Sequence, residues 1–153
     1  MTEIAFHFNV PQTLPYVCRL LRKAVNAGSR VLVTGPPVLL ETLDRELWTF
    51  APLEFVAHCT ASAPDGVLAA SPVVLATLID APQLLDIHCQ VLLNLGDSVP
   101  EGFERFTRLI EVVSYDEADI VAARQRWRYY TKAGFSMTRH DLAATSSTVS
   151  TAS

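Results

Sequence analysis

The stretch RVLVTGPPVLLETLD, residues 30–44, contains the pattern that decides the fold. Its first part is a short apolar run that ends at Gly35, which is typical of a strand covered on both faces, as in a parallel sheet. Residues 37–48 follow directly and predict a helix, because apolar side chains recur on one side: Val38, Leu39, Leu43 and Leu47. A buried strand followed at once by an amphipathic helix predicts an α/β unit.

Similar patterns continue on both sides of this unit. We expect further strands over residues 4–10, 53–59, 72–79, 90–95 and 108–115. We expect helices from Thr13, as a capping residue, to Gly28, and from near Asp116 to Gly134, with a short helix or turn over 99–106 and a loop over 60–71. The alternation predicts a three-layer α/β fold, a mostly parallel sheet with helices on both faces.

The chain is expected to form a single domain over residues 1–141. Seven of its last eleven residues are Ser or Thr, so residues 142–153 are expected to be a disordered tail. The N-terminus lacks a basic segment of the signal-peptide type, and no apolar run reaches the ~18 residues of a membrane helix. A cytoplasmic protein is therefore expected, and the three cysteines, Cys18, Cys59 and Cys89, fit as small buried residues.

The charge balance argues against a dedicated nucleic-acid binder. The formal net charge is −4, whereas proteins that bind DNA directly usually carry an excess of basic residues for phosphate contacts. Any link to DNA should therefore be indirect or confined to a local patch.

Motifs for catalysis and cofactor binding are absent from the sequence. The turn at Gly35 has one glycine and two prolines, so it lacks the backbone amides of a phosphate loop. His58-Cys59 and His88-Cys89 are adjacent pairs, and neighbours in a strand point to opposite faces, which disfavours a shared metal ion. We expect a Rossmann-like fold without a phosphate loop, with no cofactor, no metal and no enzymatic activity.

Residues 124–135, RQRWRYYTKAGF, form a basic and aromatic segment in this acidic chain. On a helical wheel one side is apolar, and a second apolar side could face the sheet. The first side contains Ile120, Ala123, Trp127 and Tyr130, and the second contains Ala118, Ala122, Tyr129 and Ala133. Arg124, Arg128 and Lys132 form a basic stripe between them. The pattern fits a surface helix with a solvated rim, but Trp, Tyr and Arg are also the residues most enriched in binding hot spots.

Several stretches together resemble the chi subunit family of bacterial DNA polymerase III. They are AFHFNV (5–10), AGSRVLV (27–33), LDRELW (43–48), LEFVAH (53–58) and EVVSYDEADIVAARQRWRYYTKAGF (111–135). The resemblance extends over residues 4–135 and is strongest from Tyr115 to Phe135. It implies a non-catalytic accessory subunit of the clamp-loader complex with an α/β fold. It also implies two partners, the psi subunit and the acidic C-terminal tail of single-stranded DNA-binding protein.

The resemblance also implies where the tail binds. The matching positions are Trp48, Phe55, Val113, Arg124 and Trp127, and Arg128 is expected to add longer-range attraction. Ile120 and Thr131 stand where the family can have basic residues. Two other functions remain open on the residues alone: a nucleotide- or small-molecule-responsive domain, and direct single-strand binding with Trp127 and Tyr130 as stacking platforms.

Overall fold

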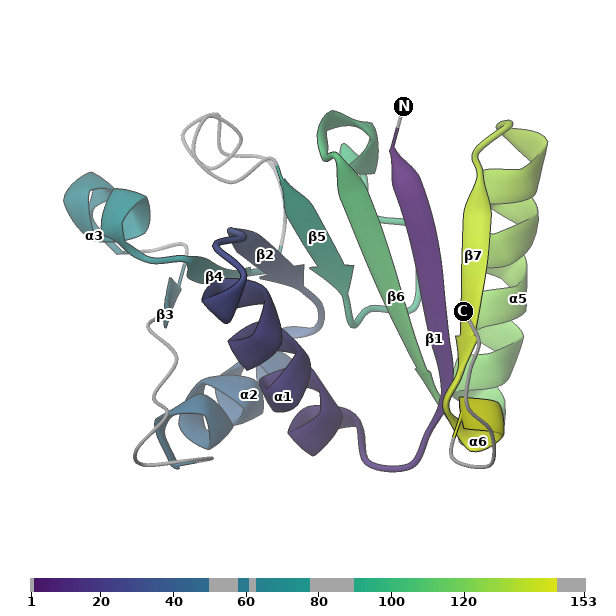
Figure 1. Ribbon diagram of the computed structural model, residues 1–153, viewed down its shortest axis with the longest axis horizontal. Coiled ribbons are helices and arrows are strands. Elements are labelled where there is room, and N and C mark those ends of the chain that lie inside the picture. Colours follow the sequence, from purple (N-terminus) through teal and green to yellow (C-terminus); the bar gives the residue numbers. More distant parts are fainter. Residues whose placement is uncertain (1, 50–57, 61–62, 78–89, 146–153) are drawn as a thin grey trace.

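The computed structural model describes residues 2–49, 58–60, 63–77 and 90–145. Its strands form a seven-stranded sheet in the order β3-β4-β2-β5-β6-β1-β7, and every neighbouring pair is parallel (Figure 1). The strands are β1 (Glu3–Val10), β2 (Val31–Thr34), β3 (His58–Thr60), β4 (Val73–Ala76), β5 (Val91–Asn94), β6 (Arg108–Ser114) and β7 (Met137–Asp141).

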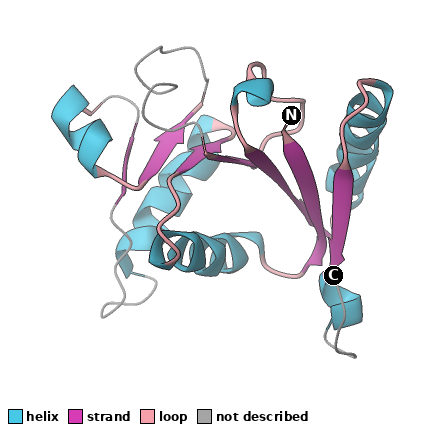
Figure 2. Cartoon of the chain, turned by 45° about the horizontal axis from the view of Figure 1, so that its top comes forward, coloured by secondary structure: helices cyan, strands magenta, loops and turns pink. Residues whose placement is uncertain are grey.

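Helices cover both faces of the sheet, as Figure 2 shows from a second direction. The long helices α1 (Thr13–Asn26) and α2 (Pro37–Thr49) lie on one face, and α5 (Glu117–Lys132) lies on the other (Figure 1). Three shorter helices are α3 (Asp65–Ala70), the 3-10 helix η1 (Phe103–Arg105) and α6 (Leu142–Thr145). The expected three-layer α/β fold is confirmed.

Two hydrophobic clusters fill the space between the sheet and its helices. Val31 and Val33 join the cluster beneath α1 and α2, whereas Leu32 joins the cluster beneath α5. Successive side chains of a strand point to opposite faces, so a strand covered on both sides is apolar at every position. All four residues of β2 are buried, as the run at residues 31–34 predicted.

The order of the strands is consistent with the usual hand of the connections. From β1 through β2 to β3 the chain moves towards one edge of the sheet, with α1 and α2 on one face. From β5 through β6 to β7 it moves towards the other edge, with α5 on the opposite face. Because the two halves differ both in the direction along the sheet and in the face that the helices cover, their crossover connections have the same hand. Parallel β-α-β units are almost always right-handed.

Most of the expected elements are present, and the differences have local causes. The expected strand over 53–59 is described only at its end, in β3; residues 53–57 lie outside the described residues. The expected loop over 60–71 contains α3, whose six residues are too few to show helical periodicity. Thr13 is not a cap: it is the first residue of α1, and Gln12 precedes it without a side-chain cap hydrogen bond.

The C-terminal part differs more from expectation. The strand β7 was not predicted, because an edge strand with polar residues, MTRHD, lacks the apolar run used to find the others. The first four residues of the expected disordered tail form α6, and Leu142 packs against the cluster beneath α1 and α2. Residues 146–153 lie outside the described residues.

A bulge in β1 changes which face its last residue meets. The register with β6 shifts between His7 and Val10, and Asn9 adopts a left-handed backbone with φ of 60°. Asn is among the few non-glycine residues that adopt this conformation readily. The extra residue sends Phe8 to the α5 side of the sheet and Val10 to the α1 side.

Candidate functional site

A groove lies between α5 and the strands β1, β6 and β7. We call it the α5 groove, and its cavity volume is about 460 Å³. Its lining residues come from these four elements: Phe6, Phe8, Asn9, Val113, Ser114, Ile120, Ala123, Arg124, Trp127 and Arg139. Because β1 is placed between β6 and β7, residues distant in the sequence meet in this groove.

Aromatic rings form the floor of the α5 groove. Phe6 and Trp127 meet edge to face, with 5.0 Å between ring centroids. The guanidinium carbon of Arg139 lies 4.9 Å from the centroid of Phe8 and 6.0 Å from that of Trp127. These distances are typical of cation–π contacts, so the rings hold Arg139 over the floor.

Among the described residues, two guanidinium groups at the rim have no carboxylate partner. Arg124 and Arg139 are exposed, and in the described part of the chain neither forms an ion pair. Nearby polar groups are already engaged: Ser114 donates a hydrogen bond to Asp119, 2.6 Å from Oγ to Oδ2. The groove therefore combines an apolar interior with cationic edges that remain available to an anion.

The helix that forms one wall is fixed by a buried polar network. Glu111 on β6 is fully buried and accepts hydrogen bonds from Arg126 Nε at 3.0 Å, from Asn94 Nδ2 at 3.0 Å and from the Tyr130 hydroxyl. Arg126 is only 4% exposed and also donates to the Asp97 carbonyl oxygen at 2.9 Å. The network sets the rotation of α5 about its axis.

Burial affects the ionisation of this network. It raises the pKa of Glu111, whereas the Arg126 charge and the hydrogen bonds from Tyr130 and Asn94 act in the opposite direction. Burial and the Glu111 carboxylate raise the pKa of Tyr130, so its hydroxyl stays a neutral donor. These donors all converge on one acceptor, which makes the network structural rather than available to a ligand.

The rotation of α5 corrects one expectation from the helical wheel. Tyr129 is 51% exposed, and Ala118 and Ala133 are exposed too, so the second apolar side does not face the sheet. Arg126 takes the sheet-facing position beside Ala123. A buried guanidinium group is tolerated there because the Glu111 carboxylate balances its charge. A helical wheel shows only the residues of the helix, so it could not indicate this partner on β6.

The structure brings together only some of the residues proposed from the sequence. Val113, Arg124 and Trp127 line the α5 groove, whereas Arg128 is exposed on the helix and does not line it. Trp48 is 60% exposed at the end of α2, where its ring lies 5.4 Å from that of His58 on β3, the opposite edge strand. Phe55 lies outside the described residues.

Sequence reasoning missed three important lining residues, Phe6, Phe8 and Arg139. The alternation FHF was a usable signal, because it places Phe6 and Phe8 on the same face of β1. Nothing in the local pattern placed that face against α5. Arg139 gave no signal, because it lies on the strand that was not predicted.

Other sites considered from the sequence have structural explanations. A Cβ atom on Gly35 would lie 3.1 Å from Leu95 Cβ, so this glycine permits close approach between the ends of β2 and β5. His58 Nε2 lies 2.9 Å from Asp44 Oδ1 and joins β3 to α2. Within the described residues, no group of three His, Cys, Asp or Glu side chains could hold a metal ion. No helix there combines the length and hydrophobicity needed to cross a membrane.

The fold defines the class of protein as a doubly wound, fully parallel α/β domain. The C-terminal domain of Dbp5 from S. cerevisiae, solved with Gle1 and IP6, superposes with a TM-score of 0.57 at 10% identity. The match covers 92% of this chain and 90% of that one. At this low identity, the likeness shows the fold alone.

Sequence comparison identifies the family. A family model described as DNA polymerase III chi subunit, HolC, matches residues 1–138. The DNA polymerase III subunit chi of Pseudomonas aeruginosa PAO1 is 30% identical over 148 residues, covering 93% of this chain and 98% of that protein. The chain belongs to the DNA polymerase III chi subunit family, as the resemblance of its motifs indicated, and is therefore an accessory polymerase subunit.

Proposed function

We propose that this chain is a non-catalytic subunit that binds the acidic C-terminal tail of single-stranded DNA-binding protein in the α5 groove. The observation that supports this most directly is the combination of an aromatic floor with two guanidinium groups, on Arg124 and Arg139, that form no ion pair within the described residues. A peptide that ends in an aromatic residue and a carboxylate offers the matching chemistry. The net charge of −4 fits a link to DNA made through a protein.

The groove suggests how such a tail would bind. The terminal aromatic ring would enter between Phe8, Ile120 and Trp127, and Arg124 would pair with the terminal carboxylate. Arg139 would pair with a preceding acidic residue while its face stays on the Phe8 ring. Arg139 thereby supplies, from β7, the second cation that Ile120 and Thr131 do not supply from α5.

The expected affinity is modest. Burying one aromatic side chain contributes about 2–3 kcal/mol, and ordering a flexible tail offsets part of it. A single peptide should therefore bind at about micromolar strength and more weakly at high salt. Several tails on one coated strand would raise the working affinity through multivalency.

We further propose that the chain pairs with the psi subunit within the clamp-loader complex, as members of this family are expected to do. The exposed Trp48 lies at the opposite sheet edge from the α5 groove. Binding of the DNA-binding protein's tail would therefore leave that edge uncovered. No residue of this chain is assigned to the psi contact.

Calorimetric titration with an acidic peptide ending in Phe tests the tail proposal. Arg124→Ala and Arg139→Ala should each weaken binding about tenfold, because each removes a charge-assisted hydrogen bond. Arg45→Ala on the exposed side of α2 is the matched control, and it should leave binding unchanged. Trp48→Ala should also have no effect, since Trp48 does not line the groove.

Unchanged affinity in both Arg124→Ala and Arg139→Ala would contradict the assignment of the groove. A peptide whose terminal Phe is replaced by Ala should bind at least several-fold more weakly. A thermal-shift screen with nucleotides tests the alternative of a nucleotide-responsive domain, since a ligand at 100 times its Kd adds about 2.7 kcal/mol of stability.

A further inference from the structure

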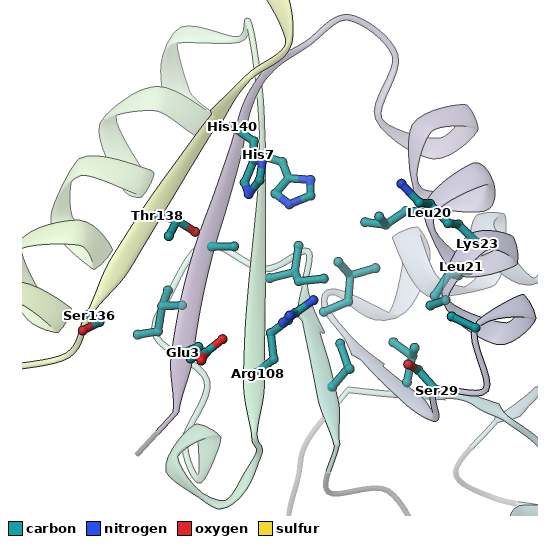
Figure 3. Close-up of a pocket in the computed structure, with 18 residues that line it drawn as sticks. Glu3, His7, Leu20, Leu21, Lys23, Ser29, Arg108, Ser136, Thr138 and His140 are labelled. Atoms are coloured by element: carbon teal, nitrogen blue, oxygen red, sulfur yellow. The ribbon is translucent and has the colours of Figure 1, made fainter. Parts of the chain in front are cut away.

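A second and larger cavity lies on the opposite face of the sheet. We call it the α1 cavity; it lies between α1 and the strands β1, β2, β5, β6 and β7, and its volume is about 710 Å³ (Figure 3). This volume lies within the range of small-molecule sites, about 300–1,000 Å³. Its apolar walls include Leu20, Leu21 and Ala24 on α1 and Val31, Leu93 and Ile110 on the sheet.

Basic and imidazole side chains from four elements converge on the α1 cavity. They are His7 on β1, Lys23 on α1, Arg108 on β6 and His140 on β7, and Glu3 is the acidic residue that lines it. Figure 3 shows the two histidines and Arg108 pointing into the space that separates the strands from α1. The ring centroids of His7 and His140 are 4.6 Å apart.

The ionisation of His7 shows that these groups act on a common point. Burial, followed by the charges of His140, Arg108 and Lys23, lowers the pKa of His7 to about 4. The Tyr16 hydroxyl on α1 completes the surroundings of the ring through a hydrogen bond with Nδ1. Burial disfavours a charge of either sign, so the part of this shift that favours an anion is the contribution from His140, Arg108 and Lys23.

In the described part of the chain, the two permanent cations of this cluster have no ion-pair partner. Lys23 and Arg108 form no ion pair there, although Glu3 and Arg108 are register partners in β1 and β6. Grouping like charges costs stability, and a bound anion would offset that cost. Hydroxyl groups of Ser29, Ser136 and Thr138 add possible hydrogen-bond donors around the same space.

We propose that the α1 cavity binds a small organic phosphate. Its apolar body packs against Leu21 and Ile110, and its phosphoryl group lies between Arg108 and Lys23, next to His7. A phosphate monoester carries a charge of about −1.5 to −2 near neutral pH, which matches two permanent cations better than a single carboxylate does. Inorganic phosphate should be a weaker ligand than an organic phosphate, because it would leave the space between the apolar walls unfilled.

This site goes beyond the proposed binding of a protein tail and does not depend on it. Ala5 and His7 of β1 line the α1 cavity, whereas Phe6 and Phe8 line the α5 groove. Successive strand residues face opposite sides of the sheet, so the two sites are separated by its thickness. Either proposal can fail while the other holds.

The test is a titration of the full chain with phenyl phosphate, followed by calorimetry and by NMR of the histidine rings. We expect saturable binding at one site, with affinity reduced about tenfold by Arg108→Gln and by Lys23→Gln. Both side chains are exposed, so the variants should fold, and a thermal melt checks this. Arg45→Gln is the matched control and should bind like the parent chain.

Two further readings sharpen the result. Inorganic phosphate should bind more weakly than phenyl phosphate, and bound phenyl phosphate should raise the pKa of His7 while leaving the His58 resonances unchanged. Absence of saturable binding at millimolar concentration would overturn the proposal. So would unchanged affinity in Arg108→Gln, or displacement of phenyl phosphate by the acidic Phe-ending peptide, which would place the ligand in the α5 groove.

Discussion

The ion pair between Glu111 and Arg126 gives the strongest prediction about stability. Glu111→Leu should destabilise the fold by about 3–5 kcal/mol, because it leaves the Arg126 charge buried without its carboxylate. The Tyr130 hydroxyl would lose its acceptor as well, whereas Asn94 Nδ2 would keep the Ser98 carbonyl oxygen at 3.2 Å. Glu111→Gln keeps the shape and one acceptor oxygen, so its cost should be smaller, about 2–3 kcal/mol.

The measurement is urea unfolding at pH 7, followed by circular dichroism. The midpoint should fall while the slope stays constant, since the surface exposed on unfolding is unchanged. Glu104→Gln on η1 is the control, because Glu104 is exposed, and its effect should stay within about 0.5 kcal/mol.

A double variant separates the charge effect from packing. Glu111→Leu combined with Arg126→Met removes both charges, so it should lose at least about 2 kcal/mol less than the sum of the single changes. Additive losses would refute the reasoning, because they would mean that the two charges do not compensate each other. A loss below about 1 kcal/mol in Glu111→Leu would refute it too.

Three further predictions concern other parts of the molecule. The pKa of His7 lies at about 4 in the folded chain and at about 6.5 when unfolded, so the unfolded state binds the extra proton between these values. Stability should therefore fall by at most about 3 kcal/mol as pH drops from 6.5 to 4, and His7→Phe should reduce this loss in urea titrations at both pH values. Asn9→Val should lower stability by about 1–3 kcal/mol, measured as a lower Tm. A β-branched residue is strained at φ of 60°, and the 2.8 Å hydrogen bond from Asn9 to Asp141 is lost. Asn9→Gly should cost less, because glycine adopts this φ without strain. Raising the salt concentration should lower the affinity for the tail peptide more in the parent chain than in Arg139→Ala, because the variant has one charge fewer to screen. Equal salt dependence of the two affinities would argue against a role for Arg139.

The fold was predictable from local sequence patterns for those strands that are covered on both faces of the sheet. Strands such as VLVT in β2 and VVLA in β4 are buried at every position and are apolar except for Thr34, because both of their faces are covered. The pattern failed for β7, whose exposed Thr138 and Arg139 are adjacent and lie between partly buried residues at the sheet edge. An edge strand needs only one covered face and one paired side, so its composition resembles that of a loop.

The candidate site was predictable only in part, for a related reason. Trp127 and Arg124 stood out because aromatic and basic residues are concentrated in the helix that became α5. Arg126, in the same segment, had no role assigned from the sequence, and it is buried against Glu111. The sequence distance between them is two residues, and only the rotation of the helix against the sheet distinguishes a rim cation from a structural one.

The sequence by itself determined the α/β class, the positions of the main strands and helices, the missing phosphate loop and the basic aromatic helix. Each of these depends on spacing within a few residues, where side-chain periodicity and turn chemistry act. The tertiary structure alone decided that β1 lies between β6 and β7, which brings Phe6, Phe8 and Arg139 to α5 and leaves Trp48 at the far edge. It also gathered His7, Lys23, Arg108 and His140 on the other face. Strand order depends on packing between segments far apart in the chain, and no local spacing specifies it.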